Sequence, residues 1–154
     1  MLKRVGREGY GELLARHQVL IREAFAAHRG DEIDTQGDAF FVAFRSASDA
    51  VAAAVAIQRA LSVEAWPEGA QVRVRIGIHS GEASAAGERY VGFSVHRAAR
   101  VGAVGHGGQV LLSDAARVLV EDDLAAAVSL RDLGTSQMVK GASGTSRISA
   151  TAIT

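Results

Sequence analysis

Residues 32–44 read EIDTQGDAFFVAF, and this stretch decides the fold. Gly37-Asp38 stands between two runs that favour β structure, which predicts a β-hairpin with its turn at these two residues. The second run, 39–44, is apolar at every position. That pattern is typical of a strand that is covered on both faces of a sheet. We therefore expect residues 32–44 to form a hairpin inside a covered sheet.

Helices and strands alternate on both sides of this hairpin. Apolar residues at helical spacing predict a helix over 8–29, ended by Gly30, and a second helix that starts after Ser46 or Ser48. Downstream, the pattern predicts a strand over 72–79, a glycine-rich loop to Gly92, a helix over 95–101, a strand over 109–112, a helix over 114–120 capped by Ser113, and a strand over 128–133. This order indicates an α+β sandwich in which helices pack on a sheet.

Length and composition limit the class of protein. The chain has 154 residues, of which 48% are apolar and 22% charged, as expected for one domain of ordinary size. Its 17 basic and 17 acidic residues balance, so we expect no broad basic face for nucleic acid. We expect the domain to span 1–140 and the small, polar residues 141–154 to form a C-terminal tail.

The sequence also indicates the compartment. It contains no cysteine, which excludes disulfides and thiolate metal sites and favours a reducing environment. The first residues lack the apolar core of a signal peptide, and no apolar run reaches the roughly 18 residues of a membrane span. We therefore expect a soluble protein of the cytoplasm without a membrane partner.

Several segments together resemble the class III nucleotidyl cyclases, the adenylate and guanylate cyclase family. Residues 32–44 resemble the family's metal-binding hairpin, and residues 74–82 resemble its strand that ends in a histidine. Residues 90–100 resemble its Gly-x-x-Val-Asn-x-Ala-Ala-Arg helix, and residues 107–113 and 130–134 resemble its later strands. The match runs from about Tyr10 to Lys140, and it is most similar to actinobacterial cyclase-like domains.

The resemblance implies a fold and a chemistry. It implies a ferredoxin-like βαββαβ core that works as a dimer, either with a second copy or with a related cyclase domain. It implies ATP or GTP as substrate, Mg²⁺ or Mn²⁺ as cofactor, and attack of the ribose 3′-oxygen on the α-phosphate with release of pyrophosphate. Such chemistry needs metal ions to activate the nucleophile and cations to stabilise the developing charge.

The metal-binding part of this pattern is incomplete. Asp38 falls on the family's second metal aspartate, and the alternative is that it is a turn residue that needs no metal. The first metal aspartate lies in the family on a strand before the first helix, but no acidic residue precedes Glu8 here. We therefore expect an N-terminally truncated domain that lacks the first, central strand.

The base-binding part carries exchanged charges. Asp34 stands where purine-selecting members have lysine, and Arg89 stands where they have aspartate. One reading is a pair of solvated loop charges. The other is a swapped ion pair across the dimer interface that keeps the contact and loses adenine recognition.

Two residues of the segment 90–100 fall on catalytic positions of the family. His96 occupies the transition-state asparagine position, and a histidine can replace only part of an amide's hydrogen bonding. Arg100 matches the transition-state arginine, although an ordinary exposed helix arginine is an equal alternative. For the other histidines, including His17 and His79, we expect structural roles.

These residues predict a degenerate cyclase homology domain that serves as a dimerising, non-catalytic module. The alternative is an active cyclase that uses manganese or takes the missing aspartate from a complete partner chain. The missing strand leaves apolar surface around Phe40, Val42 and Ile76, from which we expect a homodimer or a larger species.

Overall fold

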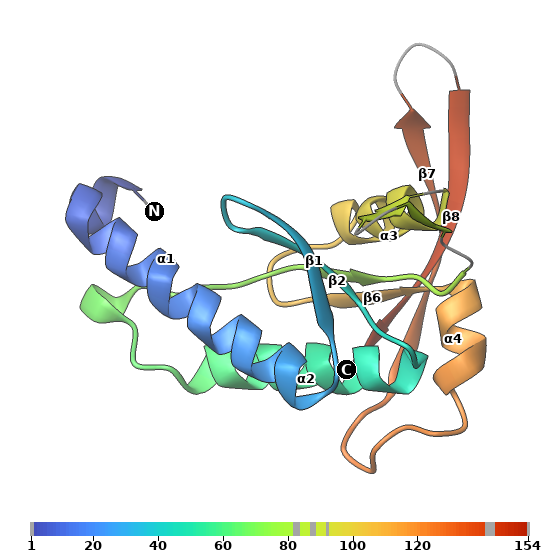
Figure 1. Cartoon of the computed structure of the whole chain (residues 1–154), viewed down its shortest axis with the longest axis horizontal. Coiled ribbons are helices and arrows are strands. Elements are labelled where there is room, and N and C mark those ends of the chain that lie inside the picture. The colour runs from blue at the N-terminus through green and yellow to red at the C-terminus, as the bar shows by residue number, and fades with distance from the viewer. Residues whose placement is uncertain (1, 82–83, 87–88, 92, 141–143, 154) are drawn as a thin grey trace. The chain divides into compact units, whose positions relative to one another are not determined.

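A computed structural model describes residues 2–81, 84–86, 89–91, 93–140 and 144–153 (Figure 1). The chain divides into two compact units, Met1–Arg73 and Val74–Thr154. Both units combine helices with strands, as the α+β prediction requires. Among the described residues, no helix has both the length and the apolar character to cross a membrane.

The first unit contains the predicted hairpin between two helices. Its elements are α1 (Leu2–Ala27), β1 (Asp31–Gln36), β2 (Ala39–Ala43), α2 (Ala47–Val63) and the 3-10 turn η1 (Pro67–Gly69). β1 and β2 pair antiparallel, with Gln36 opposite Ala39 beside the turn and Asp34 opposite Phe41. Gly37 has a φ of 61°, a left-handed conformation that glycine adopts without steric cost. The hairpin prediction is confirmed.

The end of α1 differs in detail from the prediction. Arg29, and not Gly30, takes the left-handed conformation, with a φ of 62°. The Gly30 amide donates to the Phe25 carbonyl at 2.8 Å and the Arg29 amide to the Ala26 carbonyl at 3.2 Å, which together form a Schellman motif. Gly30 is needed for space instead, because a Cβ there would lie 2.7 Å from the Phe44 ring.

Other features of the first unit agree with the sequence. Gly6 interrupts the helical backbone of α1 (φ 70°, ψ 173°), so the regular helix begins close to the predicted Glu8. Of the two cap candidates, Ser46 caps α2, because its side chain accepts from the Asp49 amide. α1 packs against α2. The buried side chains of these two helices include Leu13, Leu20, Ile21, Phe25, Val51, Ile57 and Leu61.

The second unit is built on a mixed sheet. Its elements are β3 (Ile76–Ile78), β4 (Ser84–Ala86), β5 (Arg89–Val91), α3 (Phe93–Ala103), β6 (Val110–Ser113), α4 (Asp114–Val120), β7 (Leu130–Lys140) and β8 (Gly144–Ile153). Four strands pair in the order β3-β6-β8-β7, parallel between β3 and β6 and antiparallel otherwise. β4 and β5 form a separate antiparallel hairpin. As predicted, Ser113 caps α4 by accepting from the Ala116 amide at 3.3 Å.

Three segments of the second unit differ from their predictions. The strand expected over 72–79 is regular only over Ile76–Ile78, because it pairs with the short strand β6. The expected glycine-rich loop contains the β4–β5 hairpin. Residues 144–153, within the expected tail, form β8 between β6 and β7. Small and polar residues are no obstacle to this strand, because backbone pairing to two neighbours holds it in the sheet.

A close approach of backbones sets the position of α3. A Cβ on Gly77 in β3 would lie 2.2 Å from the Gly102 amide nitrogen and 2.6 Å from the Ala98 carbonyl oxygen, both in α3. These are backbone atoms of a packed helix, so they cannot move aside as a flexible side chain would. A Cβ on Gly102 would meet Gly77 only at 3.3 Å. The helix therefore lies against β3 at a distance that glycine alone permits at position 77.

We predict that Gly77→Ala destabilises the protein by at least ~2 kcal/mol, because it forces α3 away from β3. Gly102→Ala is the matched control and should cost far less, since its Cβ meets a looser contact and alanine favours the helix. Urea denaturation followed by circular dichroism measures both free energies of unfolding. Equal stability of the two variants would contradict the close-packing argument.

Candidate functional site

Asp38 lies exposed at the hairpin turn of the first unit. The preceding residue is anchored to α1, because the Gln18 side-chain amide donates to the Gly37 carbonyl at 3.1 Å. Among the described residues, the Asp38 carboxylate makes no hydrogen bond or ion pair that would occupy its oxygens. It is therefore presented to solvent from a turn that α1 holds in place.

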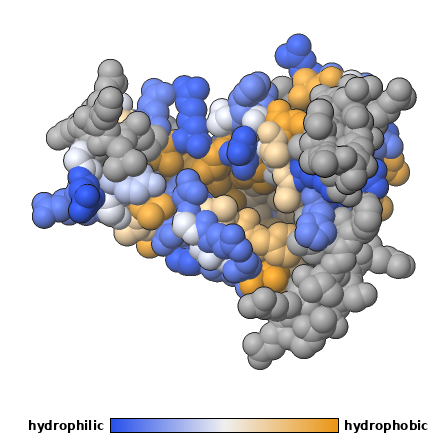
Figure 2. Space-filling view, turned by 90° about the horizontal axis from the view of Figure 1, so that it is seen from above, coloured by the Kyte–Doolittle hydropathy of each residue, from blue (hydrophilic) through white to orange (hydrophobic). Residues whose placement is uncertain are grey.

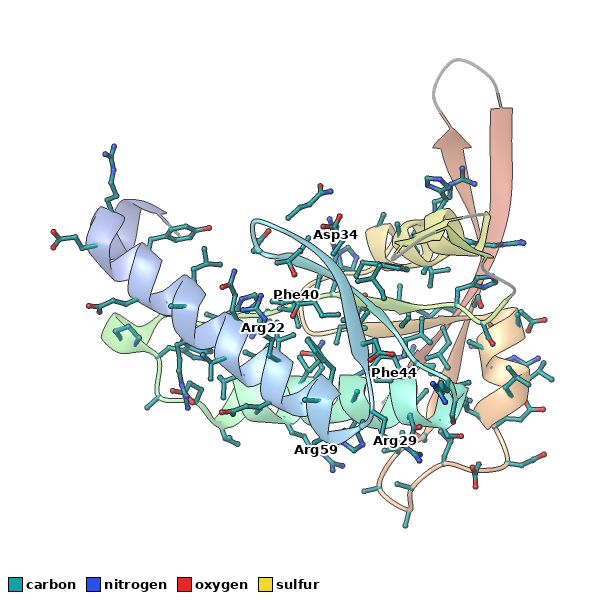
Figure 3. The ribbon with its side chains drawn as sticks, viewed as in Figure 1. Arg22, Arg29, Asp34, Phe40, Phe44 and Arg59 are labelled. Carbon is teal, nitrogen blue, oxygen red and sulfur yellow. The ribbon has the colours of Figure 1, made fainter. Side chains whose placement is uncertain are left out.

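Asp34 lies four residues earlier on β1 and is also exposed (Figure 3). Its Oδ1 accepts from the Thr35 amide at 2.9 Å, and its Oδ2 accepts from the Gln36 side-chain amide at 3.0 Å. Both carboxylate oxygens are thus engaged by the next two residues of the same strand. This position therefore carries an oriented negative charge and a pair of hydrogen-bond acceptors.

Arg22 of α1 fixes the base of the hairpin. Its guanidinium donates two hydrogen bonds to the Glu32 carboxylate, at 2.8 and 3.0 Å, and lies 5.2 Å from the centre of the Phe40 ring (Figure 3). The Thr35 hydroxyl donates to the same carboxylate. The hydrogen bonds from Arg22, and then the one from Thr35, lower the pKa of Glu32 to about 2. One arginine therefore holds both strands of the hairpin against α1.

His17 lies one helical turn before Ile21 on the buried side of α1, and only 4% of its surface is exposed. Its ring centroid is 6.3 Å from that of Phe40, and no partner for its Nδ1 occurs among the described residues. Burial lowers the pKa of His17, and the negative charge of Asp38 opposes this effect. The ring is thus a neutral packing element beneath the hairpin, as expected for a structural histidine.

In the second unit, α3 carries both predicted catalytic residues. His96 is exposed and Arg100 half-buried, and their separation of four residues places them on the same face of the helix. β5, which begins at Arg89, packs against α3. The side chain of Arg89 lies outside the described residues, so its pairing with Asp34 stays a prediction.

His79 makes a contact that the sequence analysis did not identify. Its Nδ1 lies 2.7 Å from the Ser113 hydroxyl, which joins the end of β3 to the start of α4. Ser113 already accepts from the Ala116 amide, so its own proton is available to a neutral imidazole. Burial, and then the positive charge of Arg97, lower the pKa of His79. Residue spacing alone gives no signal for this contact between positions 34 residues apart.

The described residues do not by themselves form a complete metal centre. Within this part of the chain, no three His, Cys, Asp or Glu side chains gather where they could hold an ion. Asp38 offers one oxygen ligand, whereas Mg²⁺ and Mn²⁺ require several ligands at fixed geometry. Its carboxylate can therefore contribute to a metal site only if other ligands are added.

The sequence profile of the adenylate and guanylate cyclase catalytic domain matches residues 8–147. An uncharacterised protein of Mycobacterium tuberculosis is 44% identical over 99 residues, which is 64% of this chain and 32% of that protein. An adenylate cyclase of Mycosarcoma maydis is 35% identical over 122 residues, covering 63% of this chain and 5% of that enzyme. The chain thus spans about a third of the mycobacterial relative.

A solved structure supports the same relationship. The adenylate/guanylate cyclase/hydrolase of Silicibacter pomeroyi superposes with a TM-score of 0.77 at 27% identity, covering 93% of this chain and 85% of that one. The predicted cyclase-type α+β fold is therefore confirmed, with the hairpin and the helix 93–103 as two of its elements.

We predict that acidification from pH 7 to pH 5 lowers the free energy of unfolding. The pKa values of His17 and His79 lie below the ordinary 6.5 in the folded protein, so the unfolded chain binds protons more readily. Their contribution is complete above about pH 6.5 and is lost as the pH falls through the folded pKa values. Glu32, with its pKa near 2, stays ionised throughout this range.

Urea denaturation at half-unit pH intervals measures this dependence. The double variant His17→Leu/His79→Gln should flatten the curve, whereas His106→Gln, at an exposed position, should leave it unchanged. A curve with the wild-type slope in the double variant would contradict the assignment.

Proposed function

Because the chain belongs to the adenylate and guanylate cyclase catalytic domain family, we propose that it is a dimerising, regulatory cyclase homology domain with impaired catalysis. Its place would be in cyclic-nucleotide signalling, next to a related cyclase domain or a second copy of itself. The observation that carries the proposal is that Asp38 belongs to no group of three or more His, Cys, Asp or Glu side chains that could hold a metal ion among the described residues.

The requirements of the reaction explain why one carboxylate is insufficient. When bound, paired divalent cations activate an attacking hydroxyl and stabilise the leaving phosphate oxygens. A pair of cations needs bridging and flanking carboxylates. The residues described here do not fit that requirement alone, so we assign no catalytic step to a metal in this chain.

The base-binding positions also favour impaired catalysis. Asp34 presents an anionic acceptor whose oxygens already bind the Thr35 amide and the Gln36 side chain. It cannot donate a hydrogen bond to a purine as a lysine would. His96 replaces the family's asparagine, and the chain contains no asparagine at any position. A nucleotide would therefore be held loosely and without the purine selection of complete cyclases.

A second candidate is an active adenylate or guanylate cyclase that is completed by another chain. The features that favour it are the free, exposed carboxylate of Asp38 and the retained arginine at position 100. In that case a partner would supply the missing metal aspartate, and ATP or GTP would be the substrate with Mg²⁺ or Mn²⁺. The two candidate functions differ in whether the chain converts ATP or GTP to a cyclic nucleotide.

We predict that the purified 154-residue chain forms no cyclic AMP or cyclic GMP above background with ATP or GTP, in either Mg²⁺ or Mn²⁺. The physical reason is that a single carboxylate does not hold the two cations that activate the 3′-oxygen. Product is measured by chromatography coupled to mass spectrometry.

The control for this assay is Asp38→Ala. If the wild-type chain and Asp38→Ala form the same background amount of cyclic nucleotide, the result supports a regulatory domain with impaired catalysis. Robust formation of cyclic nucleotide by the wild-type chain that disappears in Asp38→Ala would reject the proposal of impaired catalysis and favour an active cyclase. An upstream-extended version, assayed beside them, tests whether added sequence restores turnover.

We also predict how the exchanged charges behave in a double-mutant cycle. If Asp34 and Arg89 pair across a dimer, Asp34→Lys alone should weaken the dimer, and Asp34→Lys/Arg89→Asp should restore it. An exposed pair couples by at most ~1 kcal/mol, so dimer dissociation constants are the required measurement. Additive effects of the two changes would identify both residues as separate solvated charges. The double variant should remain inactive, because it adds no metal ligand.

A further inference from the structure

His79 and Ser113 lie side by side at the carboxyl ends of two strands of the second unit. β3 and β6 pair in parallel, with Ile78 opposite Leu112 as the last pair of the register. The residue that follows each strand position is His79 on one side and Ser113 on the other. In open α/β sheets, ligands bind outside the carboxyl ends of parallel strands. Both hydrophilic and hydrophobic residues reach the surface in the space-filling view (Figure 2), so the hydrogen-bonding groups and not hydropathy have to identify a ligand here.

The contact with Ser113 determines which nitrogen of His79 carries the proton. The Ser113 hydroxyl oxygen accepts from the Ala116 amide at 3.3 Å, and this serine is only 5% exposed. Its own proton needs an acceptor, and the Nδ1 of His79 lies 2.7 Å away. A neutral imidazole that accepts at Nδ1 carries its proton on Nε2. The half-buried His79 therefore presents an N–H donor on the opposite side of its ring.

Arg97 of α3 faces the same end of β3. Gly77 precedes His79 by two residues, so alternation along the strand places both on the face that α3 covers. A Cβ on Gly77 would lie 2.6 Å from the Ala98 carbonyl oxygen, and Arg97 directly precedes Ala98. Burial, and then the positive charge of Arg97, lower the pKa of His79. The backbone packing and the electrostatic effect thus agree that the guanidinium lies near the imidazole.

Both side chains have hydrogen-bond donors without a partner in the part of the chain that the structure describes. There, the exposed Arg97 takes part in no hydrogen bond or ion pair, and the His79 ring makes only the contact with Ser113. The carboxylate of Asp114, next to Ser113 in the sequence, already accepts from Arg117 at 2.8 and 3.0 Å. A guanidinium carries five donors and no acceptor. The pair therefore suits a ligand that brings acceptors and negative charge.

We propose that His79 and Arg97 bind a small oxyanion, a phosphate or a carboxylate, at the carboxyl ends of β3 and β6. The guanidinium of Arg97 pairs with two oxygens of the anion, and the Nε2–H of His79 donates to one of them. The bound anion connects the end of β3 to α3, the helix that also carries His96 and Arg100. The site needs neither a metal nor turnover, so it goes beyond the proposed function and does not depend on it.

Proton NMR of the His79 ring, assigned by the loss of its signal in His79→Gln, tests the site in the full chain. Inorganic phosphate at pH 7 and constant ionic strength should shift this signal saturably, with a dissociation constant on the order of 1 mM. Saturating phosphate should also raise the pKa of His79, because a nearby negative charge favours the imidazolium. Acetate is titrated in parallel, and the anion with the lower dissociation constant identifies the ligand as a phosphate or a carboxylate.

Arg97→Gln should weaken phosphate binding at least about tenfold, because it removes the charged, two-pronged donor. In the absence of phosphate, the same change should raise the pKa of His79, because a positive charge near the ring is lost. Arg75→Gln is the matched control. Arg75 is an exposed arginine just before the same strand, and its removal should change neither the dissociation constant nor the pKa of His79.

Each outcome decides the proposal. Saturable binding that requires Arg97 and not Arg75 supports the site. No shift, or a linear shift that is equal in Arg97→Gln, would mean an adventitious ion only and would overturn it. An unchanged pKa of His79 in ligand-free Arg97→Gln would also overturn it, because the guanidinium would then not face the ring.

Glu82 requires an arm of its own in this experiment. It follows His79 by three residues in the sequence, and its side chain lies outside the described residues. Glu82→Gln should bind phosphate at least as tightly as the wild-type chain. Binding in Glu82→Gln alone would show that the chain itself neutralises the site, and the proposal would be wrong. Cyclic nucleotides are not measured, so failure of this site leaves the proposed function to its own assay.

Discussion

The contact between Arg22 and the hairpin is the interaction on which the first unit depends. Its guanidinium holds Glu32 of β1 through two hydrogen bonds and covers the Phe40 ring of β2. A two-stranded hairpin is marginally stable in water by itself and needs packing against another element. Arg22 supplies that packing from α1, while Gln18 secures the turn. The position of Asp38 therefore follows from side chains on the polar face of a helix.

An equivalent constraint operates in the second unit, but through the backbone. The absence of a side chain at Gly77 lets α3 approach β3 closely, and α3 carries His96 and Arg100. Ser113 then links β3 to α4 by contacting both His79 and the Ala116 amide. The position of the helix that carries His96 and Arg100 thus depends on a glycine that has no catalytic assignment.

The parts of the fold that the sequence predicted are those with strong local signals. Gly37-Asp38 between two runs that favour β structure identified the hairpin, and Ser46 and Ser113 identified two helix starts. The strand β8 was missed because residues 144–153 are mostly small or polar, and its place is determined by backbone pairing to β6 and β7. Arg29 was missed because a left-handed arginine has no sequence signal. The candidate site residues could be predicted only because their positions match a sequence pattern of the family. The hydrogen bond from the Gln18 side chain to the Gly37 carbonyl could not be predicted, because the spacing of these two residues in the sequence gives no sign that they meet.

The same hairpin presents Asp38 as an exposed carboxylate in a turn that α1 holds through the Gln18 side chain. A carboxylate oxygen is a suitable ligand for a divalent cation, but such an ion requires several ligands. In the part of the chain that the structure describes, no three His, Cys, Asp or Glu side chains gather where they could hold an ion. Under the proposed function, a partner chain would therefore have to supply the remaining ligands before a metal could bind at Asp38.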